Sequence, residues 1–247
     1  MENLPLMMLR GRNVPADLRE RFQNWLFEAY VPLFLKQPSL KIVAFFQIIK
    51  DNPLYPGLLG AYHHTNIQAL EKLNENPDWT AIFNDMNKTF SRVEHVWGQS
   101  YRLLRSFGNV IRPIVNDGKD ENEPVIHFEA FKLSLEEHEK YNDWFIKWAY
   151  RVYIPVLMKL PGLKEYDHYQ RMDTHGEIPS WNYIGKPVVT EYPCYVSVLY
   201  SENLRAFENY ENSPELISFK RAMSLEVSSN LIPEWYVQYR LMRSWRK

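Results

Sequence analysis

Several segments from the first half of the chain return, in the same order, in the second half. The matching pairs are 30–32 (YVP) with 153–155 (YIP), 66–71 (NIQALE) with 203–208 (NLRAFE), and 101–107 (YRLLRSF) with 239–245 (YRLMRSW). Self-similarity of this kind indicates one structural unit present twice. We therefore predict two similar halves of about 110 residues, each close to the usual size of a domain.

The spacing between the copies predicts where the second half carries extra chain. Pro155 follows Pro32 by 123 positions, whereas Tyr239 follows Tyr101 by 138 positions. Added length is tolerated in surface loops far better than inside packed elements. We place most of it in a long loop at 174–193. The predicted organisation is a first repeat at 1–107, a linker at 108–124 and a second repeat at 125–247.

The hydrophobic pattern predicts the order β-α-β-β-α-β in each half. The expected strands are 6–10, 40–50, 58–64 and 96–107, then 125–133, 163–172, 195–200 and 235–245; the expected helices are 16–36, one from 67, 78–87, 135–159 and 203–224. At Pro32 a kink or a break into two helical pieces is expected. This order is the ferredoxin-like one, with both helices on one face of an antiparallel sheet. The bare apolar faces then cover each other, so the predicted α+β fold has two tandem ferredoxin-like repeats packed sheet to sheet.

Composition excludes several classes of protein. The net charge of −1 gives no overall basic field for nucleic acid. The single cysteine, Cys194, excludes an internal disulfide and a multi-cysteine metal site. No stretch approaches 18 uninterrupted apolar residues, and the N-terminus lacks a signal-peptide pattern, so we expect no membrane span and a cytoplasmic location. The aromatic content of 15% fits either two packed cores or an aromatic-lined ligand cavity.

Three short motifs resemble those of the dimeric α/β-barrel superfamily, and of its EthD-like branch in particular. They are the helix pattern Trp-x4-Tyr-[Val/Ile]-Pro in both halves, the segment Leu160-Pro161-Gly162, and the strand that follows it. The resemblance covers both halves and implies that one chain supplies what two chains usually supply, an intramolecular barrel. Tyr30 and Tyr153 stand where the family often has His before x-Pro. The resemblance therefore leaves the chemistry of that His in doubt for this chain.

The strand at 163–172 carries the candidate catalytic residues. Tyr166, His168 and Gln170 share one face because side chains of a strand alternate. His168 corresponds to Phe45 in the first half, so the polar residue is present only in the second half. We interpret His168 and Tyr166 as candidate catalytic groups and Gln170 as a binding group, with a working pocket in the second half. The alternative is a hydrogen-bonded, partly buried histidine with a structural role.

The remaining candidates would bind or enclose a ligand. His127 and Glu129 lie at i and i+2 on one face of a strand, where such a pair can hold a tautomer or a metal, though we predict no metal site. Trp144 and Trp148 are candidate apolar walls. The long loop contributes the candidates Trp181 and Tyr183 as a lid; a structural flap is the alternative. His63 and His64 are expected near the surface, and His95 is expected to be exposed.

Three functional hypotheses follow from these residues and the resemblance. The first is an enzyme without a cofactor, of oxygenase, isomerase or cyclase type, that acts on a small apolar or aromatic molecule. The second is a non-catalytic small-molecule-binding or structural barrel. The third is haem binding with His168 as axial ligand, although no haem signature is visible. The expected partner is a small apolar or aromatic ligand, with no nucleic acid and no membrane, and a homodimer of the two-repeat chain is a further expectation.

Overall fold

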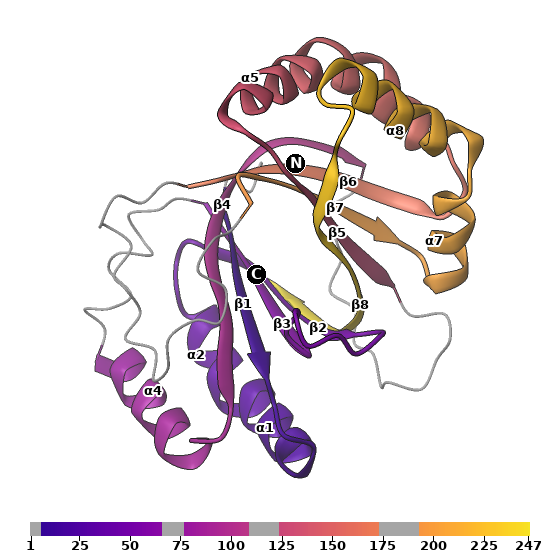
Figure 1. Cartoon of the computed structure of the whole chain (residues 1–247). Coiled ribbons are helices and arrows are strands. Elements are labelled where there is room, and N and C mark those ends of the chain that lie inside the picture. The colour runs from indigo at the N-terminus through magenta and orange to yellow at the C-terminus, as the bar shows by residue number, and fades with distance from the viewer. Residues whose placement is uncertain (1–5, 66–76, 109–123, 173–192) are drawn as a thin grey trace.

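The structure is a computed structural model that describes residues 6–65, 77–108, 124–172 and 193–247 (Figure 1). The predicted long loop, with Trp181 and Tyr183, lies outside the described residues, as does most of the predicted linker. In both halves the described elements follow the predicted order of strands and helices.

The strands are longer than predicted at some ends, and the helices are divided into shorter pieces. The first half contains β1 (Leu6–Asn13), α1 (Arg19–Trp25), α2 (Val31–Leu35), β2 (Leu40–Ile48), β3 (Leu58–His64), α4 (Pro77–Thr89) and β4 (Glu94–Gly108). The second half contains β5 (Val125–Lys132), α5 (Leu135–Trp144), α6 (Ile154–Leu157), β6 (Leu163–Arg171), β7 (Tyr195–Ser201), α7 (Leu204–Glu211), α8 (Pro214–Glu226) and β8 (Ile232–Arg246).

The eight strands form one closed antiparallel barrel in the order β1-β3-β2-β8-β5-β7-β6-β4. The two expected sheets are thus joined at both edges, where β8 pairs with β2 and β4 pairs with β6. The two seams have matching register. Tyr239 lies opposite Ile48, and Tyr101 lies opposite Arg171, where Tyr101 and Tyr239 are equivalent positions of the two halves, as are Ile48 and Arg171. Closure leaves no unpaired strand edge in the barrel, which removes a common route to aggregation.

The helices cover opposite sides of the barrel. In Figure 1, α1, α2 and α4 lie on one side, and α5, α7 and α8 lie on the other. In both halves the long helix does not break at its proline but passes through a π-helical segment just before it, at Leu26–Tyr30 and Phe145–Tyr153. Proline has no N–H for the carbonyl four residues earlier and clashes with it. The wider π turn accommodates that mismatch, so the expected kink at Pro32 takes this form.

Three apolar clusters hold these layers together. The first fills the barrel with inward residues of both halves, including Trp97 and Trp235, whose rings stack with centroids 4.3 Å apart. The second lies between the barrel and α1, α2 and α4, and the third lies between the barrel and α5, α7 and α8. Each fully buried large side chain contributes roughly 1.5–3 kcal/mol, so each of the two helix layers adds substantially to the stability of the fold.

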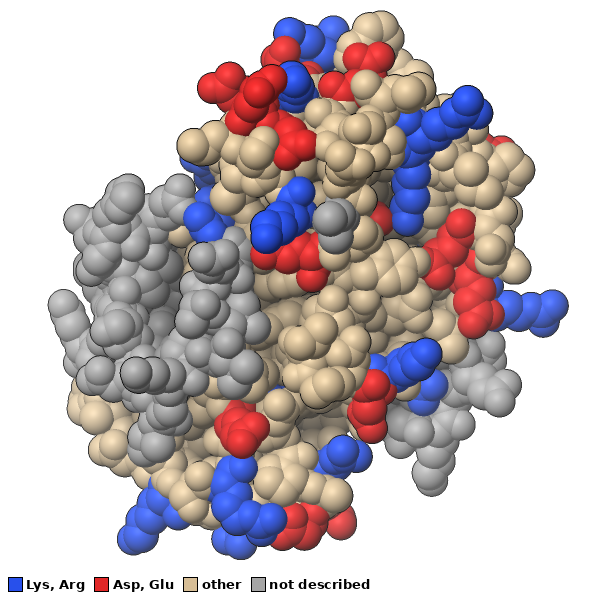
Figure 2. Space-filling model, viewed as in Figure 1, with Lys and Arg blue, Asp and Glu red and all other residues tan. Residues whose placement is uncertain are grey.

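The surface shows no extended region of one charge on the face drawn in Figure 2, where basic and acidic residues are interspersed. This agrees with the net charge of −1. Within the described parts of the chain, no helix combines the length and the apolar character needed to cross a membrane.

Candidate functional site

The predicted site residues lie between the barrel and the helices of the second half. Ser197 of β7 lies opposite Glu129 of β5 and opposite His168 of β6, so the three form one row across the sheet. This row faces α5 and α8, because Glu129 forms an ion pair with Lys220 of α8 at 3.0 Å. The row is not a Ser-His-acid triad, since each of its side chains makes its hydrogen bonds elsewhere.

His168 is fully buried in a cage of aromatic rings. Its Nδ1 lies 2.6 Å from the hydroxyl of Tyr150. Its ring centroid is 4.2 Å from that of Phe145, and those of Tyr141 and Tyr195 are each 5.7 Å away. Its Nε2 has no hydrogen-bond partner within the described part of the chain. The imidazole is therefore oriented through Nδ1, while Nε2 makes no hydrogen bond within the described part of the chain.

Burial determines the charge of this group. It lowers the pKa of His168 to about 3, so the imidazole is neutral at physiological pH. Burial also raises the pKa of Tyr150, against a smaller opposing effect of Arg105. The phenol keeps its proton, and its oxygen can accept a hydrogen bond from Nδ1–H of the neutral imidazole; this tautomer leaves the lone pair on Nε2. The pair is consequently a hydrogen-bonding unit in the resting protein and carries no charge.

Tyr166 occupies a second polar position in the same layer. Its hydroxyl lies 2.8 Å from Oγ of Ser197, and both side chains are buried. Burial raises the pKa of Tyr166 and that of the adjacent Tyr141, so both phenols remain protonated. The layer thus holds neutral hydroxyl groups and one neutral imidazole among aromatic rings.

His127 and Glu129, predicted as a pair, use separate partners. The His127 ring packs against Phe207 and Tyr236, with centroids 4.8 Å and 4.5 Å away. Burial, assisted by Lys220, lowers its pKa to about 3. The carboxylate of Glu129 forms its ion pair with Lys220. Neither residue lies in the ring cage around His168.

The other predicted binding residues fall in different places. Trp144 is buried and packs on Phe219 of α8, at 5.2 Å between centroids. Trp148 lies on the outer surface with 58% of its area exposed. Gln170 lies at the rim of the layer, where its Oε1 accepts a hydrogen bond from Arg102 at 3.0 Å. The structure thus brings Tyr166, His168 and Trp144 into one layer and leaves Trp148 outside it.

The surroundings of His168 do not fit a haem group. Axial ligation needs an open space over one ring nitrogen that admits the large planar macrocycle. Here four aromatic rings surround the imidazole, and Nδ1 is already hydrogen-bonded to the hydroxyl of Tyr150. The described residues also contain no group of three or more His, Cys, Asp or Glu side chains arranged to hold a metal ion.

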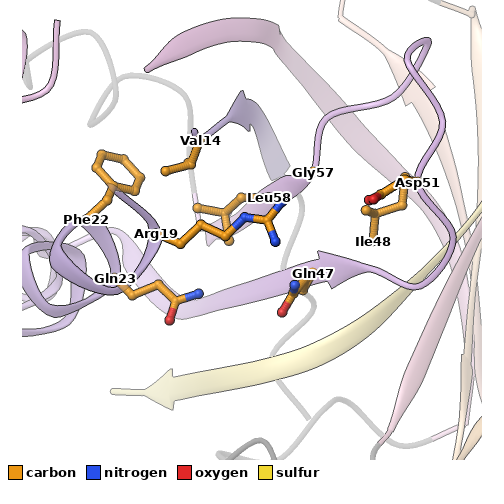
Figure 3. A pocket seen from close by; sticks show the side chains of 9 residues that line it. All are labelled: Val14, Arg19, Phe22, Gln23, Gln47, Ile48, Asp51, Gly57 and Leu58. Atoms are coloured by element: carbon orange, nitrogen blue, oxygen red, sulfur yellow. The ribbon is translucent and has the colours of Figure 1, made fainter. Parts of the chain in front are cut away.

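A pocket of about 40 Å³ opens in the first half, away from the predicted site. It lies between α1 and the ends of β2 and β3 (Figure 3). Its lining residues are Val14, Arg19, Phe22, Gln23, Gln47, Ile48, Asp51, Gly57 and Leu58. The volume is sufficient for a few water molecules or one small polar group. The working pocket was expected in the second half, so this opening is an unpredicted feature.

Several buried polar residues of the first half also differ from expectation. His63, His64 and His95 are buried, not exposed as predicted. Arg10 and Arg12 are fully buried as well. The alternation of β1 contained this signal, because both arginines share a strand face with the apolar Leu6 and Met8. That face had to be covered by helices, and the arginines are covered with it.

The comparison with known proteins identifies the fold alone. No known family model and no curated protein matches the sequence. Among solved structures, a candidate monooxygenase from Fusobacterium nucleatum is similar with a TM-score of 0.66 at 7% identity, over 100% of this chain and 96% of that one. An anthrone oxidase-like protein is similar with a TM-score of 0.60 at 11% identity, over 99% and 94%. A mutant chlorite dismutase from Candidatus Nitrospira defluvii is similar with a TM-score of 0.53 at 11% identity, over 98% and 92%. The chain therefore has the fold of the dimeric α+β barrel proteins.

Proposed function

We propose that this protein is an enzyme that acts without a cofactor on a small aromatic molecule with an acidic C–H group. The observation that carries the proposal is the buried Tyr150–His168 pair, with Nε2 of His168 unpartnered among the described residues. A buried, oriented imidazole with one unused nitrogen can accept a proton from a bound carbon acid. The aromatic rings around it would stack on a flat ligand.

The low pKa of His168 is compatible with this role. The value of about 3 belongs to the ring in its apolar cage without a ligand. A carbanion or enolate that forms beside Nε2 would raise that pKa, because the two opposite charges stabilise each other at low dielectric. Tyr150 is only partly buried, and it would swing outward to admit the ligand.

The reaction class is supported by the similarity to an anthrone oxidase-like protein and a candidate monooxygenase. We infer that the deprotonated substrate reacts directly with molecular oxygen. For anthrone, one molecule and one O2 give one anthraquinone and one water, with the first proton leaving C10 for Nε2 of His168. A general base in such a step contributes about 10²- to 10⁴-fold to the rate.

The evolutionary part of the proposal is a fused pair of ferredoxin-like units, related to the EthD-like branch. It is supported by the repeated sequence segments, the matching seams and the π-helical segment before each proline. A cytoplasmic location and a homodimer stay predictions.

A non-catalytic binding barrel is the second candidate. The observation that favours it is Tyr153, which stands where the related family often has His and which stacks on Trp144 at 5.8 Å. In this case the layer would bind an aromatic molecule without changing it.

The deciding experiment measures oxygen uptake and anthraquinone formation with anthrone and related phenols. The variants are His168→Phe, which introduces the residue found at the matching position 45, and Tyr150→Phe. Lys164→Ala is the control, because Lys164 is an exposed residue on the same strand, paired with Glu202. We expect His168→Phe to lower kcat at least 100-fold and Lys164→Ala to leave it unchanged. Binding without oxygen uptake would select the non-catalytic alternative, and equal activity in wild type and His168→Phe would contradict both the site and the role.

A further inference from the structure

Arg12 is a fully buried cation in the helix layer of the first half. Its guanidinium carbon lies 5.6 Å from the ring centroid of Tyr30 and 5.9 Å from that of Phe22. None of its three guanidinium nitrogens has a hydrogen bond of good geometry or an ion pair within the described chain. A buried charge without a partner is costly, so most buried arginines pair with a carboxylate or another anion.

Around Arg12 lie the hydroxyls of Tyr30 and Tyr62, which can accept hydrogen bonds from it but carry no charge, and a second arginine, Arg10. Arg10 donates to the hydroxyl of Tyr30 at 3.3 Å, and the hydroxyl of Tyr62 donates to the same oxygen at 3.3 Å. Burial acts to lower the pKa of Arg12, but the nearby Tyr62 and Tyr30 produce a net rise, so the guanidinium stays charged. The pKa of His95 falls to about 3 through burial and the nearby Arg12 and Arg10. Both guanidinium groups thus act on the same buried histidine.

The fold itself does not require an arginine at this position. β1 shifts register on β4 between Gly11 and Arg12, and β5 shifts register on β8 at the matching place, between Ala130 and Phe131. Phe131 thus occupies the place of Arg12 in the second half. An apolar ring fills the same structural position there, so this position of the fold accepts an uncharged side chain.

The pocket of Figure 3 is separated from Arg12 by residues that contact both, since Arg12 is not itself among the lining residues. Phe22 lines the pocket and also packs on Arg12, and Leu58 lines the pocket and pairs with Arg12 in the sheet. Figure 3 shows Arg19 extending among the other lining side chains, so an arginine also lines the pocket. A rotation of the Phe22 ring would connect the opening to the buried guanidinium.

We propose that Arg12 anchors a binding site for the carboxylate of a small organic acid. The planar guanidinium matches the two oxygens of a carboxylate, and the hydroxyls of Tyr30 and Tyr62 can turn to donate to it. Besides its polar residues, which include Asp51, the pocket has apolar walls formed by Val14, Phe22 and Leu58. These walls favour an acid with an apolar body over an inorganic anion, provided that rotation of the Phe22 ring enlarges the present small volume. This site is in the first half and does not depend on the function proposed for the second half.

The test measures thermal stability and calorimetric binding with sodium benzoate, sodium acetate and sodium phosphate, each against sodium chloride at equal ionic strength. A ligand that binds only the folded state raises Tm in proportion to its occupancy. The key variants are Arg12→Phe, which copies the second half, and Arg12→Gln, which keeps a polar side chain of similar length. Arg92→Ala is the matched control, because Arg92 is an exposed arginine of the same half, paired with Asp17 at 2.7 Å.

We expect benzoate to raise the Tm of wild type and of Arg92→Ala equally, and to bind both Arg12 variants at least tenfold more weakly. Without ligand, Arg12→Phe should be as stable as wild type or more stable, because an unpaired buried charge has been removed. If Arg12→Phe does not fold cooperatively, Arg12→Gln supplies the same comparison. Unchanged benzoate binding in the Arg12 variants, phosphate binding without benzoate binding, or no Tm rise in wild type with any of the three anions would each overturn the proposal.

Discussion

Tyr150 and His168 form a polar ring pair, with their ring centroids 5.8 Å apart and their nearest polar atoms 2.6 Å apart. Phe27 and Phe45, each 123 positions earlier in the chain, place their ring centroids 5.9 Å apart. The two halves thus hold the same ring geometry with different chemistry. The packing of helix on sheet sets the distance, and the residue types decide whether the contact is a hydrogen bond or an apolar one.

This relationship predicts a non-additive pair of mutations. Tyr150→Phe leaves Nδ1 of His168 buried without a partner and should cost about 1–3 kcal/mol of unfolding free energy. The double variant Tyr150→Phe/His168→Phe recreates the pair of the first half and should recover most of that loss. Urea unfolding of the two single variants and the double variant measures the coupling. Additive costs would show that the hydrogen bond does not couple the two residues.

Acid stability should be low because five buried histidines in the described part of the chain are neutral in the folded state. Burial lowers the pKa to about 4 for His63 and to about 3 for His64, His95, His127 and His168. Below about pH 6.5 the unfolded chain binds protons that the folded chain does not, so stability falls as the pH drops towards these values. Each group contributes about 1.4 kcal/mol per pH unit in that window. As the pH is lowered, we expect the protein to unfold before pH 4 is reached. Far-UV circular dichroism measures this transition. In His168→Phe, the unfolding free energy should fall less steeply with decreasing pH, because unfolding then takes up one proton fewer. A fold that persists at pH 3.5 would contradict the prediction.

Asp167 should make the folded state less stable as the pH rises, which is the opposite of the effect of the buried histidines. It lies buried on β6, where Tyr169 donates a hydrogen bond to it at 2.9 Å, and burial raises its pKa to about 6. The folded state holds this proton between about pH 4 and 6 while the unfolded state releases it, so stability falls as the pH rises through that window. Asp167→Asn should therefore raise the unfolding free energy at pH 8 by up to about 3 kcal/mol and have little effect at pH 4. Denaturant unfolding at the two pH values measures the difference, and an equal effect at both would exclude the charge as its cause.

Replacement of Gly162, the glycine of the Leu160-Pro161-Gly162 motif, should destabilise the fold strongly. Its φ is +91°, and an added Cβ would come within 2.4 Å of the Cβ of Ala206 on α7. Gly162→Ala should cost more than about 2 kcal/mol, since it combines a strained backbone with a clash. Gly57→Ala is the control, because the nearest atom to its added Cβ is 4.0 Å away. Thermal or urea unfolding measures both, and equal costs would contradict this reason for the glycine.

The candidate site was only partly predictable from the sequence. Strand alternation was sufficient to place Tyr166 and His168 on one face, and the comparison with Phe45 indicated that the polar residue was specific to the second half. Tyr150 was not predicted, because it comes from the helix, and helix residues meet a strand only at an angle and depth set by packing. Arg12 was not predicted as a site residue, because an arginine in a strand is usually exposed, although its alternation with Met8 and Leu6 placed it on the buried face of β1.

By itself the sequence determined the elements and their order. Hydrophobic period, turn residues and repeated segments are local properties, so they identified every strand of the barrel and the long helices. The tertiary structure alone decided how the edges join, with Tyr101 opposite Arg171 and Tyr239 opposite Ile48. It alone also decided that His64 and His95 are buried and that a pocket opens beside Phe22. Burial, protonation and cavities depend on which distant surfaces meet, and that is a property of the packed molecule that no local pattern contains.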